Sequence, residues 1–123
     1  MEWLVVGVGG AVGALLRHWV SLQLNHDFPW GTMAANAAGC FLLALLASWA
    51  LGHGLARDHL ILRLLGTGGL GALTTYSTFN LELISLASAG RWAASLLYGA
   101  LTLVLCLALG LLGWSVGRLI TSH

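Results

Sequence analysis

The sequence predicts an all-α membrane protein with four transmembrane helices. Hydrophobic residues make up 59% of the 123 residues and charged residues only 7%, and lysine is absent. An ordinary soluble domain carries about 25% charged residues, so this composition indicates a lipid environment. Because one transmembrane helix takes about 20 mostly apolar residues, four spans and short loops use up the chain. We therefore expect a single membrane domain, residues 1–123.

Apolar runs and the polar residues between them divide the chain. The predicted spans are Trp3–Leu22, Gly31–Leu51, Leu60–Ala87 and Trp92–Val116. Polar connections are predicted at Gln23–Pro29, His53–His59 and Ser88–Arg91. Tryptophan prefers the headgroup region of a bilayer, and every tryptophan lies near the end of a predicted span: Trp3, Trp19, Trp30, Trp49, Trp92 and Trp114. The start lacks the basic segment of a secretory signal, so the first span is interpreted as a helix.

The first span carries small residues on one face. Gly9, Gly13 and Arg17 recur every four residues, with Gly10 and Ala14 beside them. Such a surface lets another helix approach closely. The pattern therefore predicts that Arg17 faces protein and not lipid.

The second span contains a polar side chain, Asn36, about one and a half turns from its start. An amide at that depth needs hydrogen-bond partners or water. Two interpretations stay open: a hydrogen bond between helices, or a polar group on a hydrated pathway.

The third span is too long for one straight helix. Leu60–Ala87 would extend about 42 Å at 1.5 Å per residue, against a hydrocarbon thickness of about 30 Å. Gly68, Gly69 and Gly71 lie just before its middle, and we expect the helix to be broken there, at mid-membrane depth. Irregular backbone at that depth is tolerated where it is buried in protein or lines a water-filled cavity.

Hydroxyl and aromatic side chains follow these glycines. The hydroxyls of Thr74, Thr75, Ser77 and Thr78 are expected to supply partners for the freed backbone groups. Tyr76 and Phe79 lie three residues apart and point from one side of the second half-helix. Because the edge of an aromatic ring carries partial positive charge, such an edge can approach an anion without a full positive charge nearby.

The fourth span carries a polar stripe. Ser95, Tyr98, Thr102 and Cys106 follow one another at steps of three, four and four, which places them on one helix face. Serine and threonine can also bond back to their own helix. Cys40 and Cys106 both lie within spans, where cysteine behaves as a small hydrophobic residue, and we assign neither a disulfide nor a metal to them.

Arginine is distributed almost evenly between the two faces of the membrane. With both termini on one face, Arg57, Arg63 and Arg118 lie toward that face, and Arg17 and Arg91 toward the other. A marked excess on one side would fix the orientation, and no such excess exists. A protein with only four spans is too thin to enclose a path across the membrane by itself, so we expect an oligomer. An antiparallel, dual-topology homodimer is the leading candidate. The alternative is that a weak bias still gives one orientation.

Three stretches resemble the motifs of the small fluoride channels known as the Fluc or CrcB family. They are GGAVGALLR (Gly9 to Arg17), GTMAANAAGCF (Gly31 to Phe41) and GLGALTTYSTFNLE (Gly69 to Glu82). Length, number of spans and motif order also match. The resemblance implies an antiparallel dual-topology homodimer in the cell's inner (plasma) membrane that lets fluoride leave the cytoplasm passively, through pores at the dimer interface.

The resemblance also implies roles for individual residues. On this basis the fluoride pathway comprises Asn36, Tyr76, Ser77, Thr78, Phe79 and Thr102, and Arg17 lies at the pore vestibule. A structural sodium ion at the dimer centre would be held by the backbone carbonyls of Gly71 and Thr74. The partners expected are fluoride, a second copy of the chain and lipid, and no nucleic acid.

Two positions depart from the family pattern. Tyr76 stands where phenylalanine is usual, which adds a hydroxyl where a ring edge normally contacts fluoride, and Cys106 stands where a hydroxyl residue is common.

Three other functions fit the sequence less well. A small multidrug antiporter needs an embedded acid in the first span, and the sequence offers only Glu2 and Glu82. A non-transporting membrane subunit is a further alternative. An intramembrane hydrolase would need a histidine base at the depth of Ser77, but all five histidines lie near span ends or in loops. We therefore expect no enzyme.

Overall fold

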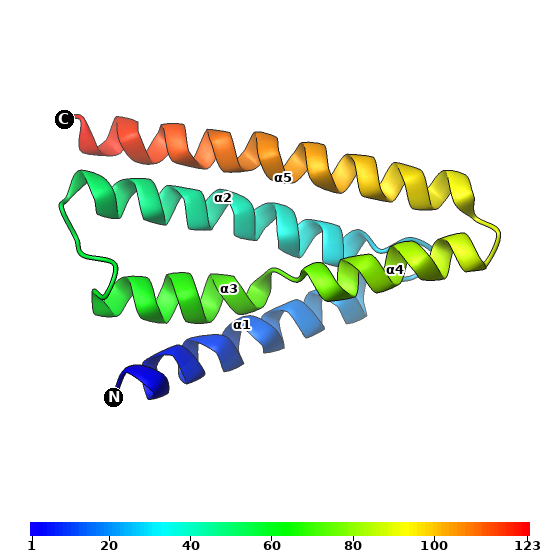
Figure 1. Ribbon diagram of the computed structural model, residues 1–123, viewed down its shortest axis with the longest axis horizontal. Coiled ribbons are helices and arrows are strands. Elements are labelled where there is room, and N and C mark those ends of the chain that lie inside the picture. The colour runs from blue at the N-terminus through cyan, green and yellow to red at the C-terminus, as the bar shows by residue number, and fades with distance from the viewer.

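The computed structural model describes residues 1–123 and is all-helical (Figure 1). Its elements are α1 (Glu2–Leu24), α2 (Trp30–Gly52), η1 (Leu62–Leu70), α3 (Gly71–Leu73), α4 (Tyr76–Ser88) and α5 (Trp92–Thr121). The element η1 is a π-helix that continues directly into α3. Three helices, α1, α2 and α5, are long and apolar enough to cross a membrane.

The helices run between two ends of an elongated bundle (Figure 1). Both termini and the connection from α2 to η1 lie at one end, which we call the terminal end. The connections from α1 to α2 and from α4 to α5 lie at the other, the connection end. The segment η1–α3–α4 also runs from end to end and occupies the predicted third span. The predicted division into four apolar segments therefore matches the elements, and α5 extends five residues beyond Val116.

The interruption of the third segment lies later than the glycines that were expected to cause it. The backbone is helical through Gly68, Gly69 and Gly71. It becomes extended at Thr74 (φ −81°, ψ 149°) and Thr75 (φ −151°, ψ 125°), between α3 and α4. Gly68 instead allows close packing against α1, because a Cβ atom at this position would lie 2.7 Å from the carbonyl oxygen of Val6.

The small residues of α1 bring it close to η1 and α3. A Cβ atom on Gly9 would overlap the Leu64 carbonyl oxygen, and one on Gly13 would overlap the Gly69 carbonyl oxygen. Both glycines are buried. The predicted close-packing face of the first span is therefore confirmed, and its partner is the first half of the third segment.

Helices α2 and α5 lie side by side along most of their length (Figure 1). A Cβ atom on Gly113 would overlap the Phe41 carbonyl oxygen, and one on Gly117 would lie 2.6 Å from the Ser48 hydroxyl oxygen. The Ser48 hydroxyl donates a hydrogen bond to the Trp114 carbonyl at 2.8 Å. Glycine on α5 thus permits backbone contact between these two helices.

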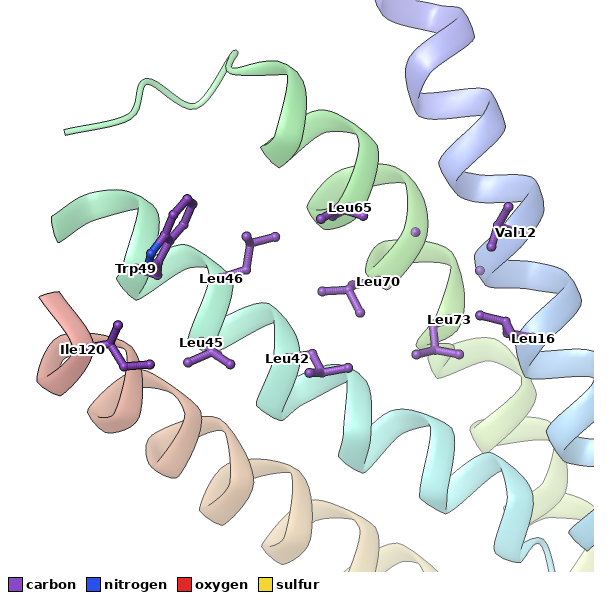
Figure 2. Close-up of a pocket in the computed structure, with 12 residues that line it drawn as sticks. Val12, Leu16, Leu42, Leu45, Leu46, Trp49, Leu65, Leu70, Leu73 and Ile120 are labelled. Atoms are coloured by element: carbon purple, nitrogen blue, oxygen red, sulfur yellow. The ribbon is translucent and has the colours of Figure 1, made fainter. Parts of the chain in front are cut away.

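An apolar hollow of about 580 Å³ opens between the helices near the terminal end. Figure 2 shows leucines of α2 and η1 pointing into it, with Val12 and Leu16 of α1 on one side and Ile120 of α5 on the other. Ten of its twelve lining residues are hydrophobic. No polar group marks this hollow as the place where an ion would be held.

Candidate functional site

The extended backbone between α3 and α4 is held by a side chain from α2. The Asn36 Oδ1 atom accepts a hydrogen bond from the Thr75 amide at 2.7 Å. The Asn36 Nδ2 atom donates to the Thr75 carbonyl at 3.1 Å. Because Asn36 is only 7% exposed, these bonds replace backbone bonds that the interruption removes. Of the two interpretations that the sequence left open, the hydrogen bond to another segment is present, and one N–H of the amide has no partner within the chain.

Hydroxyl groups complete the local bonding at the interruption. The Thr74 hydroxyl donates to the Leu70 carbonyl at 3.2 Å, and this carbonyl also accepts from the Thr74 amide. The same hydroxyl lies 3.4 Å from the Gly71 carbonyl oxygen, which the interruption frees. The Thr75 hydroxyl accepts from the Thr78 amide at 3.3 Å, which makes Thr75 the N-cap of α4. The expectation that threonines partner the freed backbone is confirmed at these two positions. The Ser77 hydroxyl contacts only the Thr75 hydroxyl, at 3.5 Å, and Ser77 is exposed.

Arg17 of α1 reaches both sides of the interruption. Its Nε atom donates to the Ala72 carbonyl at 3.0 Å, and its Nη1 atom lies 3.5 Å from the Thr78 hydroxyl oxygen. A cation near the C-terminal carbonyls of a helix is favoured by the helix dipole. The prediction that Arg17 faces protein is confirmed.

Two carbonyl groups at the interruption accept no backbone hydrogen bond: those of Gly71 and Thr74. The amide of Thr75, four residues after Gly71, bonds to Asn36. The amide of Thr78, four residues after Thr74, bonds to the Thr75 hydroxyl. The Gly71 carbonyl accepts only a long hydrogen bond from the Thr74 hydroxyl, at 3.4 Å. Carbonyl oxygens are suitable ligands for a hard cation, so the chemistry of these two groups is compatible with sodium.

The two predicted aromatic residues lie close together but in different surroundings. The ring centroids of Tyr76 and Phe79 are 6.0 Å apart. Phe79 is 6% exposed, and its ring meets that of Tyr98 at 5.1 Å in an edge-to-face arrangement. Tyr76 is 77% exposed. Within one chain, therefore, only one of the two rings is enclosed by protein.

A carboxylate cluster next to this region was not predicted from the sequence. Glu82 accepts hydrogen bonds from the Tyr98 hydroxyl at 2.6 Å, the Thr32 hydroxyl at 2.7 Å and Asn25 Nδ2 at 3.2 Å. The cluster joins α4 to α2, to α5 and to Asn25, the C-cap residue of α1. An acid within an apolar segment is expected to be paired with polar groups, and this signal could have drawn attention to Glu82.

The polar stripe of α5 faces the interior of the chain. Ser95, Tyr98 and Thr102 are buried, and Cys106 is half-buried. The Ser95 hydroxyl donates to the Leu83 carbonyl of α4 at 2.9 Å, so it does not bond back to its own helix. Thr102 is 4% exposed, and its hydroxyl has no hydrogen-bond partner. A buried hydroxyl without a partner is costly, so Thr102 offers an unused donor and acceptor.

A second hollow of about 260 Å³ lies at the connection end. It is lined mainly by polar residues, among them His26, Asp27, Arg91 and the carboxylate residue Glu82. The Arg91 guanidinium donates to the Asp27 carbonyl, which ties the two connections together. Arg17 does not line this hollow, so its predicted place at a vestibule stays a prediction.

The structure thus gathers part of the predicted site around the interruption. Asn36, Thr78, Arg17 and the carbonyls of Gly71 and Thr74 meet there. Tyr76 and Ser77 lie on the outer surface of the chain, and Thr102 lies on α5 with its hydroxyl unpaired.

Comparison with known proteins identifies relatives along nearly the whole chain. The family model "CrcB-like protein, Camphor Resistance (CrcB)" matches residues 4–114. A curated relative from Sorangium cellulosum, named Fluoride-specific ion channel FluC, is 42% identical over 121 residues, which are 95% of this chain and 94% of the relative. Relatives of the same name from Aeromonas salmonicida and Magnetococcus marinus are 43% and 40% identical, over 90% and 98% of this chain and 91% and 100% of their own lengths.

Proposed function

Since the chain belongs to the CrcB family, we propose that it is a fluoride-selective channel that lets the ion leave the cytoplasm passively. The observation that carries this proposal is the similarity to proteins named fluoride-specific ion channels, which extends over nearly the full length of both chains. The membrane is the cell's inner (plasma) membrane. In acidic surroundings fluoride enters the cell as the neutral acid, dissociates in the less acidic cytoplasm and is trapped, so a selective exit removes it.

The pathway that we propose uses weak, numerous donors. Conduction requires binding that is favourable enough for entry and weak enough for exit. Asn36 has one N–H without a partner in the chain, and the Thr102 hydroxyl has no hydrogen-bond partner. The hydroxyls of Ser77 and Thr78 lie beside the interruption. The ring edges of Tyr76 and Phe79 add a mild positive potential.

We propose that two antiparallel copies enclose this pathway. Tyr76 is 77% exposed and Ser77 is also exposed, so one chain leaves that side open. A second copy would cover these residues and the apolar hollow of Figure 2. The arginines are divided between Arg57, Arg63 and Arg118 toward the terminal end and Arg17 and Arg91 toward the connection end. Such an even division permits insertion in both orientations.

The proposal includes a structural sodium ion at the dimer centre. The Gly71 and Thr74 carbonyls, which accept no backbone hydrogen bond, would hold it together with their counterparts in the second copy. The ion would supply positive charge that offsets the clustered carbonyl dipoles. Arg17 and Asn36 hold the surrounding backbone through Ala72 and Thr75.

Ion flux from proteoliposomes tests the proposed function. Vesicles that contain the purified protein are loaded with fluoride or with chloride, and efflux is followed after dilution. We expect rapid fluoride efflux and chloride efflux close to that of protein-free vesicles. Equal rates for the two anions would rule out a fluoride-selective channel, and no flux of either would favour a non-transporting subunit.

A further inference from the structure

The two cysteines of the chain lie opposite each other in the contact between α2 and α5. These helices run in the same direction (Figure 1) and keep a fixed register. The hydrogen-bonded residues Ser48 and Trp114 are 66 residues apart. Thr32 and Tyr98, which share the Glu82 carboxylate, have the same separation.

Cys40 and Cys106 have this separation too, and they lie between the two pairs along the helices. Gly110, which lies one turn after Cys106 on α5, faces the backbone of Cys40, because a Cβ atom on Gly110 would lie 4.0 Å from the Cys40 carbonyl oxygen. Both thiols are free and half-buried. The sequence alone suggested two separate small hydrophobic residues, whereas the register of the helices makes them a pair.

We propose that Cys40 and Cys106 form a binding site for a soft divalent cation that two thiolates satisfy, with mercury(II) as the representative ion. Thiolates select soft metals. On binding, each thiol releases its proton to water and each sulfur forms one bond to the metal. No electron is transferred, and two chloride ions leave when the metal arrives as neutral mercuric chloride, which can enter through lipid.

The charge of the complex and the number of ligands restrict the metal. Two thiolates and one divalent cation give a neutral complex, which avoids the cost of burying a charge between helices. A monovalent soft cation would leave one negative charge there. Zinc prefers four protein ligands in a closed site, and no group of three or more His, Cys, Asp or Glu side chains gathers anywhere in the chain. We therefore expect the site to discriminate against zinc.

The test is a mercury titration of the purified protein in detergent, with excess monothiol as a competing ligand and native mass spectrometry as the readout. We expect one mercury per chain, with a mass gain of one metal ion minus two protons. Zinc chloride at the same concentration is expected to leave the mass unchanged. Because the readout is metal binding, the result does not depend on whether the protein conducts fluoride.

Single variants provide matched controls. Cys40→Ser or Cys106→Ser keeps a similar size but removes one sulfur ligand, and each should weaken mercury binding at least about 100-fold because the second bond is no longer intramolecular. The double variant sets the background, since the chain has no other cysteine. Wild-type affinity in either single variant would overturn the proposal. So would two mercury ions per chain, or mercury that links two chains on a denaturing gel.

A second measurement does not need variants. One equivalent of mercury per chain should protect both cysteines of the wild-type protein from alkylation by a maleimide, as mapped on peptides. Protection of one cysteine with full alkylation of the other would contradict a shared site.

Discussion

At the scale of single residues, the Phe79 ring is the sharpest test of the proposed pathway. Phe79→Ile keeps an apolar side chain but removes the ring edge that can face an anion. We expect fluoride efflux from proteoliposomes to fall at least tenfold, which corresponds to about 1.4 kcal/mol of barrier. Phe79 is buried against Tyr98, so the substitution can also disturb packing. Gel filtration therefore checks that the variant still assembles as a dimer. An assembled variant that conducts like the parent would refute the ring-edge mechanism.

The matched control for that variant is Tyr76, the exposed member of the pair. Tyr76→Phe restores the residue that the family usually carries and keeps the ring, so efflux should stay near that of the parent. Tyr76→Ile removes the ring and should reduce efflux. Equal efflux in the phenylalanine and isoleucine variants would show that the ring at this position does not act on the ion.

Glu82 tests the carboxylate cluster independently of conduction. Glu82→Gln keeps the shape but places an NH₂ group either at the Oε2 position, where the Tyr98 hydroxyl donates, or at the Oε1 position, where the Thr32 hydroxyl and Asn25 Nδ2 donate. Leaving a buried donor unsatisfied costs about 1–3 kcal/mol, so the thermal unfolding midpoint in detergent should fall.

The control for Glu82 is Glu2→Gln, which removes an exposed ion pair with Arg63. Exposed ion pairs contribute about 0–1 kcal/mol, so the midpoint should change little. If both variants unfold at the same temperature as the parent, the cluster does not stabilise the fold.

At the scale of elements, the sequence predicts the four apolar segments well because length and hydropathy are local properties. The position of the interruption was predicted wrongly, because the glycines Gly68 and Gly69 could mean either a break or close packing. What locates the break is Asn36, 39 residues from Thr75. The Glu82 cluster was not predicted because its donors, like the partner of Thr75, come from distant parts of the chain.

The clamp between α2 and the interruption gives a prediction of its own. Asn36→Ala leaves the amide and carbonyl of Thr75 without partners. At about 1–3 kcal/mol for each buried group, we expect a lower unfolding midpoint and faster hydrogen exchange at Thr75 and Thr78. Asn80→Ala is the control, because Asn80 is an exposed amide on α4. Unchanged exchange at Thr75 in the Asn36 variant would contradict the clamp.

At the scale of the whole molecule, sodium is expected to act as a structural ion. Replacing sodium by a large organic cation during purification should loosen the dimer or lower fluoride efflux, because the Gly71 and Thr74 carbonyls would lose their counter-charge. Cross-linking yield and efflux are measured in both buffers, and restoring sodium should restore both. A dimer that forms and conducts equally well without sodium would remove the ion from the proposal.

The balance of arginines makes the orientation of the chain sensitive to small changes. Tags at the C-terminus should be detected on both sides of the membrane, because three arginines toward one face and two toward the other give no decisive bias. Adding two lysines to the His53–His59 connection should favour the orientation that keeps the terminal end in the cytoplasm.

If the working unit is antiparallel, that added charge makes matched partners scarce, so efflux per chain should fall although each chain still folds. Efflux should return when two different copies are co-expressed. The first copy carries two added lysines in the His53–His59 connection, and the second carries two in the Ser88–Arg91 connection. The added charges then drive the two copies into opposite orientations. Restored efflux distinguishes lost partners from damage to the loop. A C-terminal tag found on one side only, with full efflux, would show that antiparallel pairing is not required.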